Sequence, residues 1–132
     1  MTSQRVVTAY RQTEIQSRTP LELVVLLYDG GLRFLYQTRE AIARGDIAAR
    51  RDASARALAI VSELQNTLNI EEGGDIARQL DELYTYVNGR ILQAAMDNSV
   101  APIDDATRVL SMLRESWAAI ATPSDQPVRG AA

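Results

Sequence analysis

Apolar residues are densest in the stretch from 19 to 45, which reads TPLELVVLLYDGGLRFLYQTREAIARG. A helix that buries one face needs apolar residues only at positions i, i+3, i+4 and i+7. This stretch has enough of them for two rows on different faces, one through Leu27 and the other through Tyr28. The pattern predicts a helix over about 20–44 that either lies at the centre of its own fold or shares one face with a partner.

Signals for the start and the end of this helix flank the apolar stretch. Thr19 can cap the first turn, Pro20 suits the first helical position, and Glu22 completes a capping box with Thr19. At the other end, Gly45 can take the left-handed conformation that commonly ends a helix. The boundaries of the predicted helix are therefore set by local chemistry as well as by its apolar pattern.

Asp29, Gly30 and Gly31 lie inside this predicted helix. Each glycine in a helix interior costs about 1 kcal/mol relative to alanine. An Asp-Gly pair can also form a hairpin turn, but the helical period continues to Phe34 and Ala41. We therefore predict one unbroken helix. We interpret the glycines as points where another helix crosses closely, in preference to a notch for a ligand.

Three further stretches show helical periodicity, and turn residues separate them. We predict helices over about 47–69, 75–97 and 103–121. Asp46 is the expected cap of the first and Asp75 of the second, after a loop at Gly73-Gly74. Asp104 or Asp105 is expected to cap the last. The apolar rows of these helices are Ala53, Ala57, Ile60 or Val61, Leu64 and Leu68; Ile76, Leu80, Leu83, Val87 and Ile91, with a smaller row of Ala77, Tyr84, Ile91 and Ala95; and Ala106, Leu110, Leu113, Trp117 and Ile120.

Four amphipathic helices with short connections predict an all-α fold, an antiparallel up-down four-helix bundle over residues 19–121. Residues 1–18 are polar apart from an apolar island that includes Val7 and Tyr10. They form either a frayed terminus with one hydrophobic anchor or a partly helical mobile arm that covers an apolar surface. Residues 122–132 contain two prolines and have no periodicity, so we expect a disordered tail.

The composition excludes most kinds of chemistry. The 132 residues include no Cys and no His, and all 14 basic residues are Arg. The chain therefore has no thiolate, no imidazole and no lysine for a Schiff base. We expect a protein that is not an enzyme and that needs no cofactor or metal.

The charge and the hydropathy pattern exclude further classes. The net charge of −3 gives no basic footprint for nucleic acid. No apolar run is long enough to span a membrane, and the N-terminal sequence lacks the apolar core of a secretory signal. We expect a cytoplasmic protein. The surplus apolar surface suggests a groove that accepts an amphipathic helix of another chain, and the alternative is a homo-oligomeric structural or adaptor bundle.

A series of short motifs runs along most of the chain. These are Ala9-Tyr10, Thr19-Pro20-Leu21-Glu22-Leu23, Leu27-Tyr28-Asp29-Gly30, Gly45-Asp46, Gly73-Gly74, Leu83-Tyr84 with Tyr86, Arg90-Ile91-Leu92 with Ala94, and Trp117. No single motif is specific. In this order and spacing, however, the set resembles the flagellin-specific export chaperone family of the FliS type, over about residues 7–120.

The resemblance implies a cytoplasmic four-helix chaperone that binds the C-terminal segment of flagellin. It implies that the chaperone prevents premature polymerisation and assists delivery to the flagellar type III export apparatus. Further implied partners are the export gate and the flagellar anti-sigma factor. An apolar row on a helix does not distinguish residues that line a groove from residues buried in the core. We therefore expect about half of the expected contacts to be core residues. The expected flagellin contacts are Val7, Tyr10, Leu21, Val24, Tyr28, Leu64, Leu68, Tyr84, Val87 and Ile91.

Overall fold

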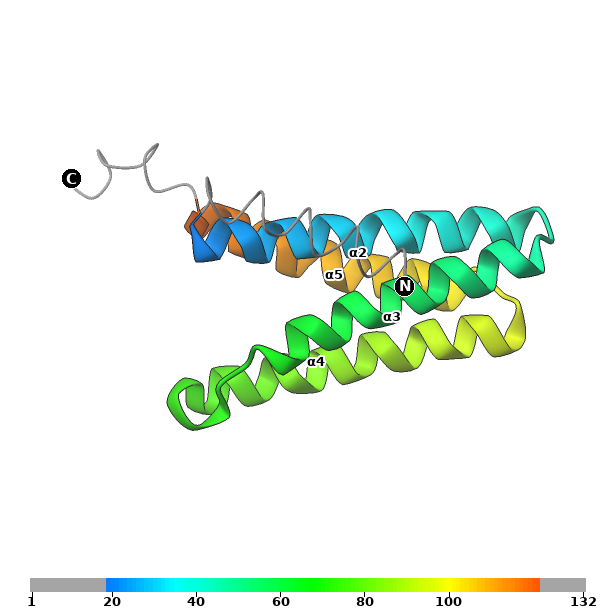
Figure 1. The fold of residues 1–132 in the computed structure, drawn as a ribbon. Helices are drawn as coiled ribbons and strands as arrows, with labels where there is room; N and C mark the ends of the chain where they lie inside the picture. Colours follow the sequence, from blue (N-terminus) through cyan, green and yellow to red (C-terminus); the bar gives the residue numbers. More distant parts are fainter. Residues whose placement is uncertain (1–18, 122–132) are drawn as a thin grey trace.

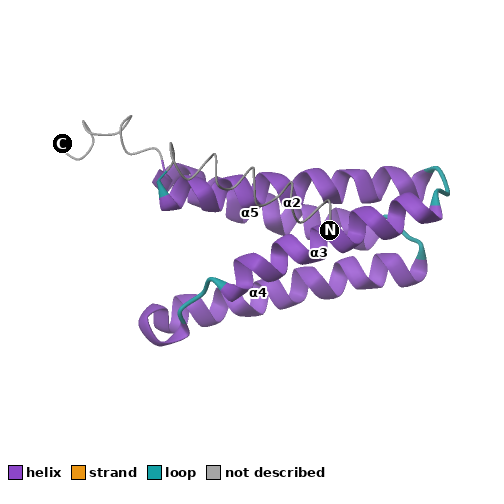
Figure 2. Ribbon diagram, in the orientation of Figure 1, coloured by secondary structure: helices purple, strands orange, loops and turns teal. Residues whose placement is uncertain are grey.

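Four α-helices make up the part of the chain that the computed structural model describes, residues 19–121 (Figure 1). Short loops join them, and the described residues contain no strand (Figure 2), so the predicted all-α fold is confirmed. The predicted arm at 1–18 and tail at 122–132 lie outside the described residues. The helices are α2 (Pro20–Ala43), α3 (Ile47–Asn66), α4 (Ile70–Asp97) and α5 (Ala101–Ala121).

Each helix packs against two others, which gives the predicted up-down bundle. Helix α2 contacts α3 and α5, and α4 contacts the same two helices. Each connection is only three residues long, so consecutive helices run antiparallel. Figure 1 shows α2 alongside α5 and α3 alongside α4. None of the four described helices is long and apolar enough to cross a membrane.

Both ends of α2 form as the sequence predicts. The Thr19 hydroxyl accepts a hydrogen bond from the Glu22 amide at 3.1 Å, and the Glu22 carboxylate accepts one from the Thr19 amide at 2.9 Å. Gly45 has a φ of +74°, and the following amide of Asp46 donates to the Ala41 carbonyl at 2.9 Å. These bonds satisfy backbone groups that a helix terminus would otherwise leave unpaired.

The start of α4 differs from the prediction. The helix begins at Ile70, because Asn69 acts as its cap and accepts a hydrogen bond from the Glu72 amide at 3.1 Å. The expected loop is instead a kink at Gly74, where φ is 58° and ψ is −132°. A residue with a side chain rarely adopts this conformation. The double glycine therefore bends a helix that was predicted to begin only at Asp75.

The start of α5 also differs. The helix begins at Ala101, and Pro102 lies in its first turn, where a missing amide proton costs nothing. Neither predicted cap is at the terminus. Asp105 instead links α4 to α5, because its carboxylate accepts hydrogen bonds from the Tyr86 hydroxyl and from Arg90 Nε. The Tyr86 hydrogen bond is the main cause that holds the pKa of Asp105 below its ordinary value.

The two glycines in α2 lie where α2 meets α3. Both are buried, and α2 continues through them without interruption. A Cβ added to Gly30 would lie 3.1 Å from Ile60 Cδ1, and one added to Gly31 would lie 3.4 Å from Ile60 Cγ2. A side chain at Gly30 would force Ile60 to shift by a few tenths of an ångström, whereas one at Gly31 would lie at the tight limit of ordinary contact with it. This agrees with the interpretation of the glycines as packing positions.

Candidate functional site

One half of the bundle has a fully covered interior. We call residues 29–63 and 85–110 the closed half, which contains the α2–α3 and α4–α5 connections. Its large interior side chains are 0% exposed, as Leu35, Val61 and Leu110 illustrate. Side chains from all four helices fill this interior, and further apolar side chains of the closed half, such as Phe34 and Ile60, are partly buried against it.

The other half is incompletely covered. We call residues 19–28, 64–84 and 111–121 the open half, where the α2–α5 pair diverges from the α3–α4 pair (Figure 1). Every side chain from 21 to 27 is only half-buried, and within 111–120 no described residue is buried. Six apolar side chains pack against the core here and stay partly exposed, and we call them the open-half surface. They are Val24, Leu27, Leu68, Leu80, Leu113 and Trp117.

A pair of tyrosines lies at the border between the halves. The hydroxyls of Tyr28 in α2 and Tyr84 in α4 are 2.5 Å apart, and their ring centroids are 6.5 Å apart. Burial raises the pKa of both hydroxyls, so both stay neutral. Each hydroxyl supplies a hydrogen-bond partner for the other, as buried polar groups require. The pair joins α2 to α4, two helices that lie diagonally across the bundle.

Polar contacts hold each diverging pair of helices together. In the α2–α5 pair, Arg114 Nε donates to the Asp29 carboxylate at 2.8 Å. In the α3–α4 pair, the Gln65 amide donates to the Asp81 carboxylate at 2.8 Å. Each pair of helices is therefore held together by its own polar contact. We call the α2–α5 pair and the α3–α4 pair the two arms of the open half.

The predicted flagellin contacts divide into three groups. Val7 and Tyr10 lie outside the described residues. Leu21, Val24 and Leu68 are half-buried in the open half. The remaining five are at most 2% exposed and form part of the core, so their side chains are not on the surface of the free bundle. These five are Tyr28, Leu64, Tyr84, Val87 and Ile91.

The predicted apolar rows are wrong near the ends of the open half. Ile76 and Leu83 of α4 are 71% and 37% exposed, and Ile120 of α5 is 57% exposed. The buried residues of α4 are Ala77, Tyr84, Val87, Ile91 and Ala94, so its interior follows most of the smaller predicted row together with Val87 of the larger one. Where two helices diverge, a row of residues that is covered by the neighbouring helix at one end becomes exposed at the other.

Sequence reasoning missed four of the six residues of the open-half surface as site residues, and it treated one of these four, Trp117, as a packing residue. Leu80, Leu113 and Trp117 were assigned to core rows, and Leu27 was assigned to the row of the first helix that also contains Phe34. These residues have the spacing of interior positions in their helices. They are partly exposed because the two pairs of helices diverge in the open half. The one signal available was the surplus of apolar residues at the start of α2.

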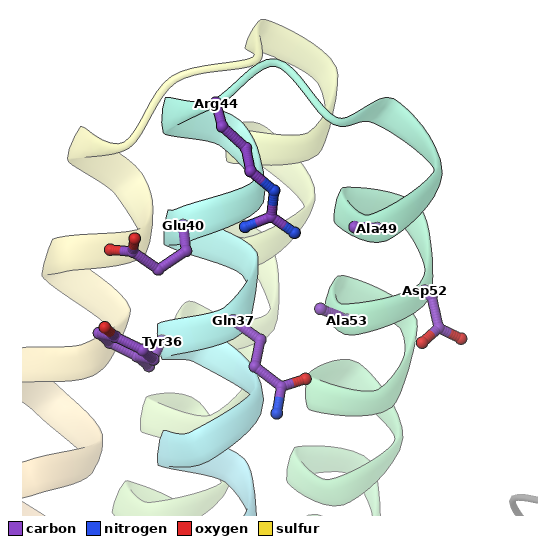
Figure 3. Close-up of a pocket in the computed structure, with 7 residues that line it drawn as sticks. All are labelled: Tyr36, Gln37, Glu40, Arg44, Ala49, Asp52 and Ala53. Carbon is purple, nitrogen blue, oxygen red and sulfur yellow. The ribbon is translucent and has the colours of Figure 1, made fainter.

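A hollow lies on the outer side of the closed half, between α2 and α3 (Figure 3). Its volume is about 360 Å³. Charged and polar groups line much of it, so it does not suit an apolar helix, and none of the predicted site residues contributes. Among residues 19–121, no group of three acidic side chains is placed to hold a metal ion. The lining residues are Tyr36, Gln37, Glu40, Arg44, Ala49, Asp52 and Ala53.

Comparison with known proteins places the chain in a family. The family model described as "Flagellar protein FliS" matches residues 2–124. The flagellar secretion chaperone FliS of Salmonella typhimurium is 34% identical over 114 residues, which cover 83% of this chain and 84% of the relative. FliS of Campylobacter jejuni is 36% identical and covers 83% and 85% of the two chains. FliSB of Pseudomonas aeruginosa is 30% identical and covers 89% and 96%. The chain therefore belongs to the FliS family.

Proposed function

We propose that this member of the FliS family is a flagellar export chaperone whose client is the C-terminal segment of flagellin. In the cytoplasm, it covers that segment, prevents premature polymerisation and assists delivery to the flagellar type III export apparatus. The observation that supports this most directly is the open-half surface, where apolar side chains of α2, α4, α5 and the α3–α4 connection pack against the core and stay half-exposed. Contiguous apolar surface of this kind is typical of a site for a protein partner.

The geometry suits an amphipathic helical client. Such a client presents apolar anchors at i, i+3, i+4 and i+7 to a groove between helices. Val24 and Leu27 are three residues apart on α2, and Leu113 and Trp117 are four apart on α5, so each pair lies on one helix face. A disordered client loses conformational entropy when it binds, and a preformed surface avoids adding a second ordering cost.

The family also suggests further roles. We propose that the chain binds the flagellar anti-sigma factor and docks on the export gate. Val7 and Tyr10 are proposed to occupy part of the client surface when it is empty. The chaperone family supports no catalytic role, and we propose none.

The test is calorimetric titration of the full chain with the C-terminal segment of flagellin from the same organism. An internal flagellin segment of equal length is the control. We expect saturable binding with a negative heat-capacity change, because apolar surface is buried. Only the C-terminal segment should bind.

The opposite result would be no heat of binding for the C-terminal segment, together with a stable dimer in light scattering. That combination favours the alternative, a homo-oligomeric bundle that covers the open-half surface with a second copy of itself.

A further inference from the structure

The formal charge of the bundle is concentrated at one end. The closed half carries eight carboxylates and eight arginines and is therefore neutral. The open half carries seven carboxylates and two arginines, a net charge of −5. Five of those seven carboxylates lie on α4 between Ile70 and Tyr84, in the same stretch as the half-exposed Leu80. The negative charge of the described residues is thus concentrated on the α4 side of the open half instead of being spread over the bundle.

The two arginines of the open half already have partners. Arg78 pairs with Asp75, and Arg114 pairs with Asp29 through Nε and Oδ1 at 2.8 Å. Within residues 19–121, no arginine lies at ion-pair distance from Glu71, Glu72 or Glu82, and all three residues are exposed. Ion pairs among the described residues therefore leave Glu71, Glu72 and Glu82 without a cationic partner.

We infer that the occupant of the open-half surface is an amphipathic segment with basic residues beside its apolar face. This inference rests on the proposed function and adds the charge of the client to it. The apolar side chains of the occupant pack between the arms, and its Lys or Arg residues lie near Glu71, Glu72 and Glu82. Complementary charge speeds association and disfavours partners of the same sign.

The binding of two matched synthetic peptides to the full chain tests the inference. Both are helical peptides of about 20 residues with identical apolar positions, about 30 Å long and thus longer than the part of α2 that lies in the open half. One carries Lys at its polar positions and the other carries Glu. Calorimetry compares them at about 0.03 M and about 0.5 M salt, because salt screens exposed charges. We expect the Lys peptide to bind about tenfold more tightly at low salt, with a smaller difference at high salt.

A variant and a matched control show which carboxylates cause the preference for the Lys peptide. The open-half variant combines Glu71→Gln, Glu72→Gln and Glu82→Gln, and should lose most of the preference for the Lys peptide. The control removes the same number of charges from the closed half with Glu40→Gln, Asp52→Asn and Asp97→Asn, and should keep it. Circular dichroism checks that both variants fold. The comparison of the two peptides on the unmodified chain does not depend on either variant.

Two results would overturn the inference alone. Equal affinity for the two peptides at low salt, with normal binding of the flagellin segment, would remove the charge preference and leave the proposed function intact. If the folded open-half variant still preferred the Lys peptide as strongly as the unmodified chain does, Glu71, Glu72 and Glu82 would not be the source of that preference. If neither the peptides nor the flagellin segment bound, the proposed function would fail together with the inference.

Discussion

Replacing Ile91 by alanine is expected to lower the free energy of unfolding by about 2–5 kcal/mol. Ile91 is 0% exposed and belongs to the core cluster with Leu35, Val61 and Leu110. The substitution removes three carbon atoms from a filled interior, and the cavity that remains adds to the lost transfer energy. Chemical denaturation followed by circular dichroism measures the change.

The neighbouring residue supplies the control. Leu92 is 50% exposed, so Leu92→Ala should change the free energy of unfolding by less than about 0.5 kcal/mol. The sequence also predicted Ile91 as a flagellin contact, so the affinity of the Ile91→Ala variant for the flagellin segment should be measured as well. A large loss of client affinity in Ile91→Ala, without a loss of stability, would contradict its place in the core.

Replacing Val24 by asparagine is expected to weaken binding of the flagellin segment by about 100-fold, roughly 3 kcal/mol at about 1.4 kcal/mol per tenfold. Val24 is half-buried and packs against the core at the open half. A bound client would cover it completely and leave the new amide without water. Lost apolar contact and an unsatisfied polar group each contribute about 1–3 kcal/mol. Asparagine is uncharged, so the effect is independent of the acidic surroundings.

Leu92→Asn is the matched control for affinity, because Leu92 lies on an exposed position of the closed half. Its client affinity should stay within about threefold of the unmodified chain, a difference below 1 kcal/mol. Thermal unfolding verifies that both variants are folded at the temperature of the titration. Equal client affinity for Val24→Asn and the unmodified chain would remove Val24 from the contact surface.

The local chemistry of the sequence accounts for most of the fold. The capping box at Thr19, the left-handed Gly45 and the cap at Asp46 all form as predicted. These features depend on residues within a few positions of each other, so one sequence is enough to recognise them. Gly73 and Gly74 were misjudged as a loop because Asn69 also caps a helical turn, and a kink at Gly74 lets that turn continue into α4.

The site was predictable only in part, because burial depends on how far apart the helices lie. Ile91 and Leu80 both belong to one predicted row of the third helix, yet Ile91 is in the core and Leu80 is half-exposed. The difference follows from the tertiary arrangement. Small interior residues such as Ala57, Ala94 and Ala106 suit close packing in the closed half. The Tyr28–Tyr84 pair marks the border beyond which the arms diverge.

We expect the client to bind between the arms of the open half, where the single Trp of the chain lies. Trp117 is half-buried and is the only Trp in the 132 residues, so its fluorescence reports on this surface alone when the client segment lacks Trp. Titration with the flagellin segment should shift the Trp117 emission to shorter wavelength and reduce quenching by acrylamide, with the affinity that calorimetry gives. Calorimetric binding with unchanged Trp117 emission and unchanged quenching would place the client elsewhere and contradict the account.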